Sequence, residues 1–128
     1  MANLFVDRTT AVLNKVLDGA SARQRVLANN IANVDTPGYT RQEVHFEDAL
    51  KEAIDDPGTD GQLKVAAIEQ VEIETATDHQ TPGRDNGNNV AIDREMADMA
   101  KNSLQYETAA QLLYSKFRLL RNAIKEGR

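Results

Sequence analysis

The sequence predicts a mainly α-helical protein, with two long terminal amphipathic helices that pair as a coiled coil and a short, partly extended or β middle segment. Three observations lead to this fold class: apolar residues three and four positions apart near both ends, proline and glycine between those stretches, and a strongly acidic middle. We expect a single domain over residues 1–128, made of an N-terminal helix over 1–34, an acidic middle with a turn, a short helix and extended segments over 35–89, and a C-terminal helix over 90–128.

The N-terminal helix is predicted from an apolar stripe that only Gly19 interrupts. Pro37 disfavours helical geometry at the residue before it, so a helix that begins near Leu4 should end by about Val34 or Asp35. The residues of this stripe that we expect to pack against a partner helix are Leu13, Leu17, Leu27 and Ile31.

The C-terminal helix is predicted more strongly, because its apolar positions alternate spacings of four and three over about four heptads. Asn88 and Asn89 are candidate N-caps, and Asp93 and Glu95 put negative charge in the first turn, where the helix dipole favours it. Arg118, Arg121 and Lys125 put positive charge near the last turn. The seam consists of Ile92, Met96, Met99, Ser103, Tyr106, Ala110, Leu113, Phe117, Leu120 and Ile124.

The middle segment has weaker patterns. Apolar residues over 46–54 are spaced as in a short amphipathic helix, which the Asp-Pro-Gly of 56–58 should end. Alternation over 71–75, and more briefly over 63–65, favours two strands in a small hairpin or an extended arm. Proline, glycine and asparagine predict a loop over 78–89.

Charge is distributed unevenly along the chain. The formal net charge is −5, and residues 35–89 carry thirteen acidic and four basic side chains, whereas both ends are mildly basic. This distribution argues against nucleic-acid binding and suggests that the ends and the middle face different surroundings. An acidic, solvated loop region is the alternative interpretation of the middle.

Other features of the composition limit the classes of protein. The chain has no cysteine, so a disulfide and a thiolate nucleophile are both excluded, and the redox compartment stays open. No apolar run approaches the roughly 18 residues of a membrane span, and the N-terminus has no Sec-type signal pattern. We therefore expect a soluble chain without membrane insertion.

Three asparagines stand together where the N-terminal helix should end. Asn33 can cap the helix, and Gly38 has the freedom to adopt the positive φ of a type II turn with Pro37 at its second position. Asn29 and Asn30 lie before the last turn, where a plain cap does not explain them. Since an amide both donates and accepts hydrogen bonds, we expect at least one of these two to contact a neighbouring subunit.

Two long helices cannot cover both of their apolar seams by pairing only with each other, so we expect oligomerisation. Tyr39, exposed after the turn, and Tyr106, in the seam, are candidate aromatic anchors. We expect Tyr106 to belong to the core, against Leu17 or Leu27.

An enzyme is a poor alternative for this sequence. His45 and His79 fall in or beside predicted loops, with no second histidine at a metal-ligand spacing. Neighbouring carboxylates lie beside turns or on one strand face, and Gly-rich phosphate loops are absent from the sequence. We therefore expect no catalytic, cofactor or metal site. The stronger alternative is a soluble helical adaptor or chaperone that forms a small coiled-coil oligomer.

Two groups of residues resemble a known family, the bacterial flagellar rod and hook proteins. The first group lies at the end of the N-terminal helix and in the turn that follows: Asn29, Asn30, Ile31, Ala32 and Asn33, then Thr36, Pro37, Gly38 and Tyr39. The second comprises Gly87-Asn88-Asn89-Val90, Asp93-Arg94-Glu95 and Asn102-Ser103-Leu104-Gln105-Tyr106. Within the family, the second group and the short length are similar to the proximal rod proteins.

The resemblance implies a structural subunit of the flagellar basal-body rod, which assembles through its terminal helices into the periplasmic drive shaft that transmits torque. It implies export by the flagellar type III apparatus without a cleaved signal peptide. The implied partners are further copies of the chain, a rod protein similar to FlgC, a rod-base adaptor similar to FliE and the export gate. No nucleic acid and no cofactor are implied. We expect the amphipathic termini to be partly unfolded in the free chain and to become ordered on assembly.

Overall fold

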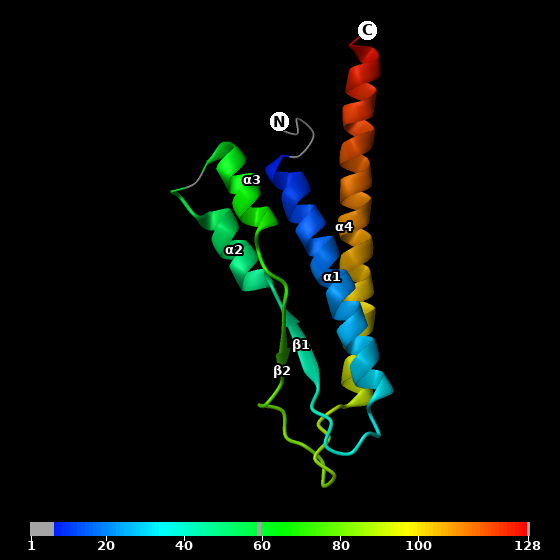
Figure 1. Cartoon of the computed structure of the whole chain (residues 1–128). Helices are drawn as coiled ribbons and strands as arrows, with labels where there is room; N and C mark the ends of the chain where they lie inside the picture. Colours follow the sequence, from blue (N-terminus) through cyan, green and yellow to red (C-terminus); the bar gives the residue numbers. More distant parts are fainter. Residues whose placement is uncertain (1–6, 59, 128) are drawn as a thin grey trace.

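The mainly α-helical fold class is confirmed. The computed structural model describes residues 7–58 and 60–127 of the 128-residue chain. Two long helices lie side by side, and the middle of the chain forms two short helices and a two-stranded antiparallel sheet to one side of them (Figure 1). In chain order the elements are α1 (Arg8–Ala32), β1 (Gln42–His45), α2 (Glu47–Asp55), α3 (Gly61–Glu69), β2 (Glu74–Thr77) and α4 (Ile92–Glu126).

Helix α1 is bounded by side-chain caps at both ends. The Asp7 carboxylate accepts a hydrogen bond from the Thr10 N–H at 2.9 Å, and Asn33 forms the C-cap. The end predicted from Pro37 is therefore confirmed. The start lies at Arg8 rather than near Leu4, and Leu4 itself is outside the described residues.

Helix α4 begins at Ile92, after Ala91, and has no side-chain N-cap. The prediction that Asn88 and Asn89 cap it is wrong, because both amides bond to other parts of the chain, as described below. The acidic first turn, with Asp93 and Glu95, is confirmed, as is the basic residue in the last turn, Lys125.

The middle segment agrees with the sequence only in part. The short helix α2 and the absence of helix and strand over 78–89 are confirmed. The strand predicted over 63–65 is wrong, because these residues lie in α3, which begins after the cap Asp60. There Val65 and Ile68, three positions apart, are buried on one face while Leu63 is exposed.

The sheet pairs two segments that were not predicted from the sequence to pair. Strand β2 spans residues 74–77, shifted toward the C-terminus from the predicted 71–75, and its partner is β1 rather than residues 63–65. The antiparallel register aligns Gln42 with Thr77 and His45 with Glu74. A strand was not expected at β1 because its sequence, Gln-Glu-Val-His, has one apolar residue.

The hydrophobic core lies between α1 and the middle segment. Val44 of β1, Phe46 just before α2, Leu50 of α2 and the buried face of α3 pack against α1. The Phe46 ring lies where Gly19 has no side chain, since a Cβ built on Gly19 would be 2.2 Å from the ring. The one interruption in the apolar pattern of α1 is therefore the contact point for an aromatic ring.

None of the helices in the described part of the chain is long and apolar enough to cross a membrane.

Candidate assembly site

The turn after α1 has the geometry that Pro37 and Gly38 predict. Gly38 adopts a φ of +75°, and the Tyr39 N–H donates to the Thr36 carbonyl at 3.3 Å, which closes the turn. Asn33 contributes twice: its amide donates to the Asn29 carbonyl at 2.8 Å, and its side-chain oxygen accepts from the Thr36 hydroxyl at 3.1 Å. The predicted C-cap is confirmed.

The second motif group folds back onto this turn. The Gly38 N–H donates to the Asn86 carbonyl at 2.9 Å, and the buried Asn88 amide donates to the Asn33 and Thr36 carbonyls, each at 2.8 Å. Gly87 also has a positive φ, +82°, and a Cβ at that position would lie 3.4 Å from the Gly38 Cα. Two segments about fifty residues apart in sequence thus form one loop cluster, at the lower end of the molecule in Figure 1.

Asn30 is fully buried and joins three elements. Its amide donates to the Gln42 carbonyl at 2.9 Å and to Glu95 Oε2 at 3.0 Å, and its oxygen accepts from the Gln42 N–H and the Tyr39 hydroxyl. A contact between Asn30 and a neighbouring subunit is therefore ruled out in this conformation, because every polar atom of its side chain is used inside the chain. Asn29 is exposed, and for Asn29 the expected contact stays a prediction.

Tyr39 is half-buried rather than exposed, which corrects the expectation from the sequence. Its hydroxyl donates to the Asn30 side-chain oxygen at 3.1 Å. Burial raises the pKa of Tyr39 above its ordinary value, and the negative charge of Glu95 adds to the shift. Tyr39 therefore stays protonated and serves as a hydrogen-bond donor beneath the turn.

A buried ionic cluster lies next to Asn30 and was not predicted. Arg41 is 3% exposed, and its guanidinium donates to Glu95 Oε1 at 2.7 Å and to Asp78 Oδ2 at 3.0 Å, with Glu43 as a third carboxylate partner. Burial disfavours the charge, but the hydrogen bonds that Arg41 donates to Glu95, Asp78 and Glu43 outweigh this effect and raise the pKa of Arg41. Arg41 thereby connects β1 to α4 and to the segment after β2.

Asp78 is a second buried member of this cluster. Its carboxylate accepts hydrogen bonds from the Thr81 hydroxyl and N–H, from Arg41 and from the Gln80 N–H. The hydrogen bond from the Thr81 hydroxyl and that from Arg41 lower the pKa of Asp78 well below its ordinary range, against the effect of burial. Asn89 closes the ring, because it accepts from the Arg41 N–H at 2.6 Å and donates to the Asp78 carbonyl at 2.9 Å.

The face that α4 turns toward α1 differs from the predicted seam. The buried residues of α4 are Glu95, Asn102 and Ala109, which recur every seven residues. Asn102 fixes the contact, since its amide donates to the Ala20 carbonyl at 2.9 Å and to Gln24 Oε1 at 3.0 Å. The sequence pattern concealed this face because two of its three residues are polar.

The predicted seam residues fall on several faces of the pair. On α1, Leu27 is buried, and Leu13, Leu17 and Ile31 are half-buried. On α4, Met99, Leu113 and Leu120 are half-buried, whereas Met96 and Phe117 are exposed. Tyr106 is 45% exposed and lies beside Ala20, Ser21 and Gln24, so the expectation that it belongs to the core against Leu17 or Leu27 is wrong.

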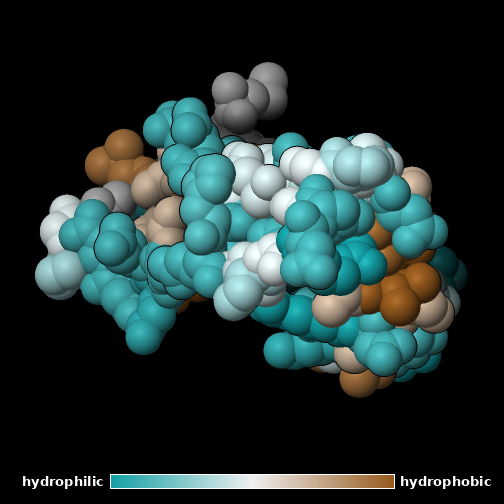
Figure 2. All heavy atoms as spheres, turned by 90° about the horizontal axis from the view of Figure 1, so that it is seen from below, coloured by the Kyte–Doolittle hydropathy of each residue, from teal (hydrophilic) through white to brown (hydrophobic). Residues whose placement is uncertain are grey.

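Helix α4 leaves large apolar side chains in water. Of the ten large hydrophobic residues that are exposed in the described part of the chain, nine lie on α4: Ile92, Met96, Leu104, Tyr106, Leu112, Tyr114, Phe117, Leu119 and Ile124. Seen from below, the loop end of the molecule is mostly hydrophilic, and the larger hydrophobic areas lie to the side where α1 and α4 run (Figure 2). Such an exposed surface is typical of a protein that binds further chains.

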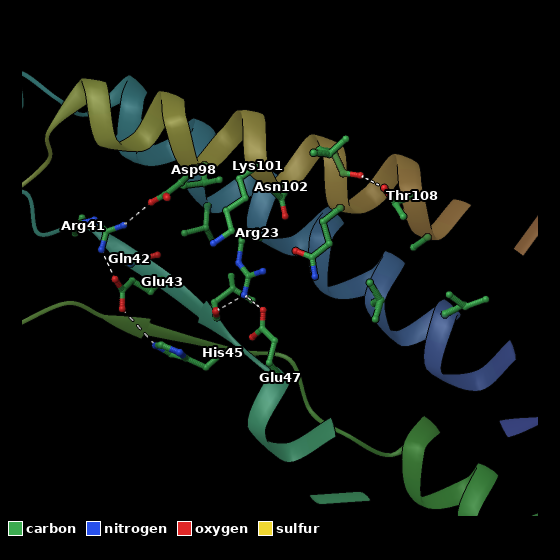
Figure 3. Close-up of a pocket in the computed structure, with 18 of the residues that line it drawn as sticks. Arg23, Arg41, Gln42, Glu43, His45, Glu47, Asp98, Lys101, Asn102 and Thr108 are labelled. Carbon is green, nitrogen blue, oxygen red and sulfur yellow. Dashed lines mark hydrogen bonds and ion pairs between the residues drawn. The ribbon is translucent and has the colours of Figure 1, made fainter. Parts of the chain in front are cut away.

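An open groove of about 870 Å³ runs between α1, β1 and α4 (Figure 3). Its apolar lining comes mainly from Leu13, Val16, Val26, Leu27, Leu104 and Leu112. Arg23 lies at the β1 end, where it donates to the Val44 carbonyl at 2.9 Å, pairs with Glu47 and covers the Phe46 ring at 5.3 Å. The shape and lining suit a helix better than a polar small molecule.

Both histidines of the chain lie at its surface. His45 and His79 are both exposed, and His45 Nε2 lies 3.5 Å from Glu43 Oε2. Within residues 7–58 and 60–127, no three histidine, cysteine or carboxylate side chains form a group that could hold a metal ion. The arrangement instead fixes the turn, the loop cluster and the start of α4 in one rigid unit.

Comparison with known proteins agrees with this structural character. The family model described as flagella basal body rod protein matches residues 17–40, from the middle of α1 through the turn. The chain is 31% identical to the flagellar basal body rod protein FlgB of Aeromonas hydrophila, over 93% of this chain and 94% of that protein. The protein of the same description from Borrelia hermsii is 30% identical, over 96% of this chain and 99% of its own length. That from Bacillus subtilis (strain 168) is 29% identical, over 91% of this chain and 92% of its own length.

Proposed function

Since the chain belongs to the FlgB family of flagellar basal body rod proteins, it is a structural subunit of the proximal rod, and we propose that it assembles through α1 and α4 into the axial shaft that transmits torque. Torque in such a shaft passes by contact between packed helices. A subunit of this kind needs no catalytic centre.

The observation that carries this proposal is the distribution of apolar residues around α4. Successive residues of a helix are rotated by about 100°, so Phe117 and Leu119 point to nearly opposite sides. Ile124 shares the side of Phe117, and Leu112 shares that of Leu119, each pair being seven residues apart. All four are exposed, so burying them requires neighbours on more than one side of α4, as in the wall of a rod.

The proposed assembly motif is the turn with the helix end before it. Asn29, Ala32, Thr36, Pro37 and Gly38 are exposed at the loop end, whereas Asn30 and Asn33 hold them in place from beneath. A rigid, exposed turn at one end of an elongated subunit suits a contact with the next subunit along an axis. Ile31 and Tyr39 belong to the supporting layer, since both are half-buried.

The proposed neighbours are further copies of the chain, a rod protein similar to FlgC, a rod-base adaptor similar to FliE and the flagellar type III export gate. Delivery through the type III apparatus without a cleaved signal peptide is part of the same proposal. An export channel requires an extended chain. The terminal helices gain much of their burial only on assembly, so unfolding them in the free chain costs little free energy.

The test is an in-frame deletion of the gene in its source bacterium, scored by swimming and by cryo-tomography of basal bodies. We expect loss of motility, with membrane rings present and rods absent, and recovery of both when the gene is restored. Intact flagella in the deletion strain would contradict the proposal and favour a soluble helical adaptor.

A further inference from the structure

Helix α4 extends well beyond the helix it packs on. An ion pair joins Lys116 to Asp7, the residue that caps α1, and so marks the level at which α1 begins. Beyond this level α4 continues to Glu126 and stands clear of the other elements (Figure 1). Residues 121–127 are all exposed. We call residues 116–127 the α4 tip.

The α4 tip is apolar and basic at once. Phe117, Arg121 and Ile124 are spaced by four and three residues, so they share one face of the helix. The tip as a whole contains four basic residues and one acidic residue. Its natural binding surface is therefore an apolar groove with carboxylates along the rim.

The groove between α1, β1 and α4 has this character. Its floor is apolar, and Glu43, Glu47 and Asp98 at its edge all have half-exposed or exposed carboxylates. Three basic residues also line it: Arg41 is buried among carboxylates, Arg23 is paired with Glu47, and Lys101 is exposed on α4. Beyond the β1 end the acidic surface continues along α2, where Asp48, Glu52 and Asp55 are exposed.

The tip cannot reach the groove of its own chain. The groove is lined by α4 residues from Asp98 to Leu112, and the tip begins at Lys116 on the same uninterrupted helix. A continuous helix does not fold back on itself, so an α4 tip that occupies the groove must come from another chain. When one surface of a subunit binds a different surface of the next copy, the contacts repeat from copy to copy; they form a ring if the rotation between copies closes and an open helical filament if it does not.

We propose that the α4 tip of one copy binds the groove between α1, β1 and α4 of a second copy, with Phe117 and Ile124 on the apolar floor and Arg121 at the rim carboxylates. This inference rests on the proposed rod function and adds to it a head-to-tail contact between identical chains. The occupant is thus defined by its chemistry: a helix with an apolar face and a basic residue at the edge of that face.

Disulfide cross-linking in assembled basal bodies tests the contact directly, because the chain has no cysteine of its own. The variant carries Thr108→Cys in the groove and Ile124→Cys on the tip, and leaves Phe117 and Arg121 unchanged. The two sites are sixteen residues apart on one helix, roughly 24 Å, so they cannot form a disulfide within one chain. The matched control is Leu63→Cys with Ile124→Cys, since Leu63 is exposed on α3 outside the groove.

We expect oxidation to give a ladder of multimers in the Thr108→Cys/Ile124→Cys variant and little in the control. Adding Arg121→Glu should lower the yield several-fold, whereas Arg25→Glu, exposed on α1 and not part of the groove lining, should leave it unchanged. A variant that enters basal bodies and restores swimming but gives no ladder overturns this contact and leaves the rod function standing. A cross-link only to a different protein, identified by mass spectrometry, overturns the second copy as occupant. Absence of the wild-type chain from purified basal bodies overturns both proposals.

Discussion

Gly19 lies in the middle of α1, and its lack of a side chain is what lets Phe46 approach the helix. On an exposed helix position, replacing glycine by alanine gains about 1 kcal/mol. Here a Cβ would lie 2.2 Å from the Phe46 ring, which is itself buried. We therefore predict that Gly19→Ala lowers the free energy of unfolding by about 1–3 kcal/mol, measured by chemical denaturation.

A double-mutant cycle separates this clash from any other effect on the helix. Phe46→Leu should make room for the added methyl group, so Gly19→Ala should cost less in that background than in the wild type. Ser21→Ala, on the exposed side of α1, serves as the control for alanine in this helix. Equal costs of Gly19→Ala in both backgrounds would show that the Phe46 contact is not the cause.

Gly38 has a different reason to be glycine. Its φ of +75° suits residues without a Cβ, and no atom lies within 4 Å of a Cβ built there, so the cost of substitution is conformational rather than steric. We predict that Gly38→Val destabilises the fold by about 1–2 kcal/mol and impairs swimming, while Gly38→Asn has a smaller effect on both. Normal swimming with Gly38→Val would show that the turn is dispensable for assembly.

Asp78 gives the fold a dependence on pH in the acid range. Its pKa in the folded protein lies below the ordinary 3.8, so its stabilising effect is fully present above that value and is lost as the pH falls toward the folded-state pKa. We predict that the unfolding free energy declines below about pH 4 and that Asp78→Asn, which removes about 1–3 kcal/mol at neutral pH, flattens this decline. The control is Asp85→Asn, an exposed change in the same loop. If the unfolding free energy declined as steeply with Asp78→Asn as in the wild type, other carboxylates would be the cause.

At the scale of elements, the sequence predicted what depends on local geometry. The spacing of apolar residues predicted α1, α2 and α4, and Pro37 predicted the end of α1, because helix propensity and termination act within a few residues. Strand β1 escaped prediction because it has one apolar residue, and α3 because the alternation over 63–65 favoured a strand. What stabilises each of them is distant in sequence: β1 needs β2, and α3 needs α1.

The candidate site was predictable to the same extent. The turn residues could be assigned from φ preferences alone. The cluster of Arg41, Asp78 and Glu95 could not, since charged residues are normally exposed and nothing in the spacing of these three indicates that they meet. Glu95 is fully buried, but its place in the first turn of α4 already accounted for its charge, so nothing in the sequence pointed to a buried partner.

The two halves of α4 should differ in stability. The first half is fixed by Glu95 and Asn102, whereas residues 121–127 are all exposed. We predict that, in the free chain, amide hydrogens of residues 117–126 exchange much faster than those of 95–109, and that assembly into rods protects both. Uniformly slow exchange along α4 in the free chain would contradict ordering on assembly.

The apolar surface of α4 is exposed in the single chain and must be buried in an axial subunit. Self-association of the chain should therefore depend on its concentration. We predict that the mass measured by sedimentation rises with protein concentration, and that Leu119→Lys weakens association by tenfold or more, because burying one leucine contributes about 1.5–3 kcal/mol. Leu63→Lys is the matched control, since Leu63 is about as exposed as Leu119 but lies on α3 rather than on a terminal helix. If both substitutions weakened association equally, the middle segment would take part in the contact as well. A folded chain that stayed monomeric at every concentration would instead mean that other rod proteins, rather than further copies, cover α4.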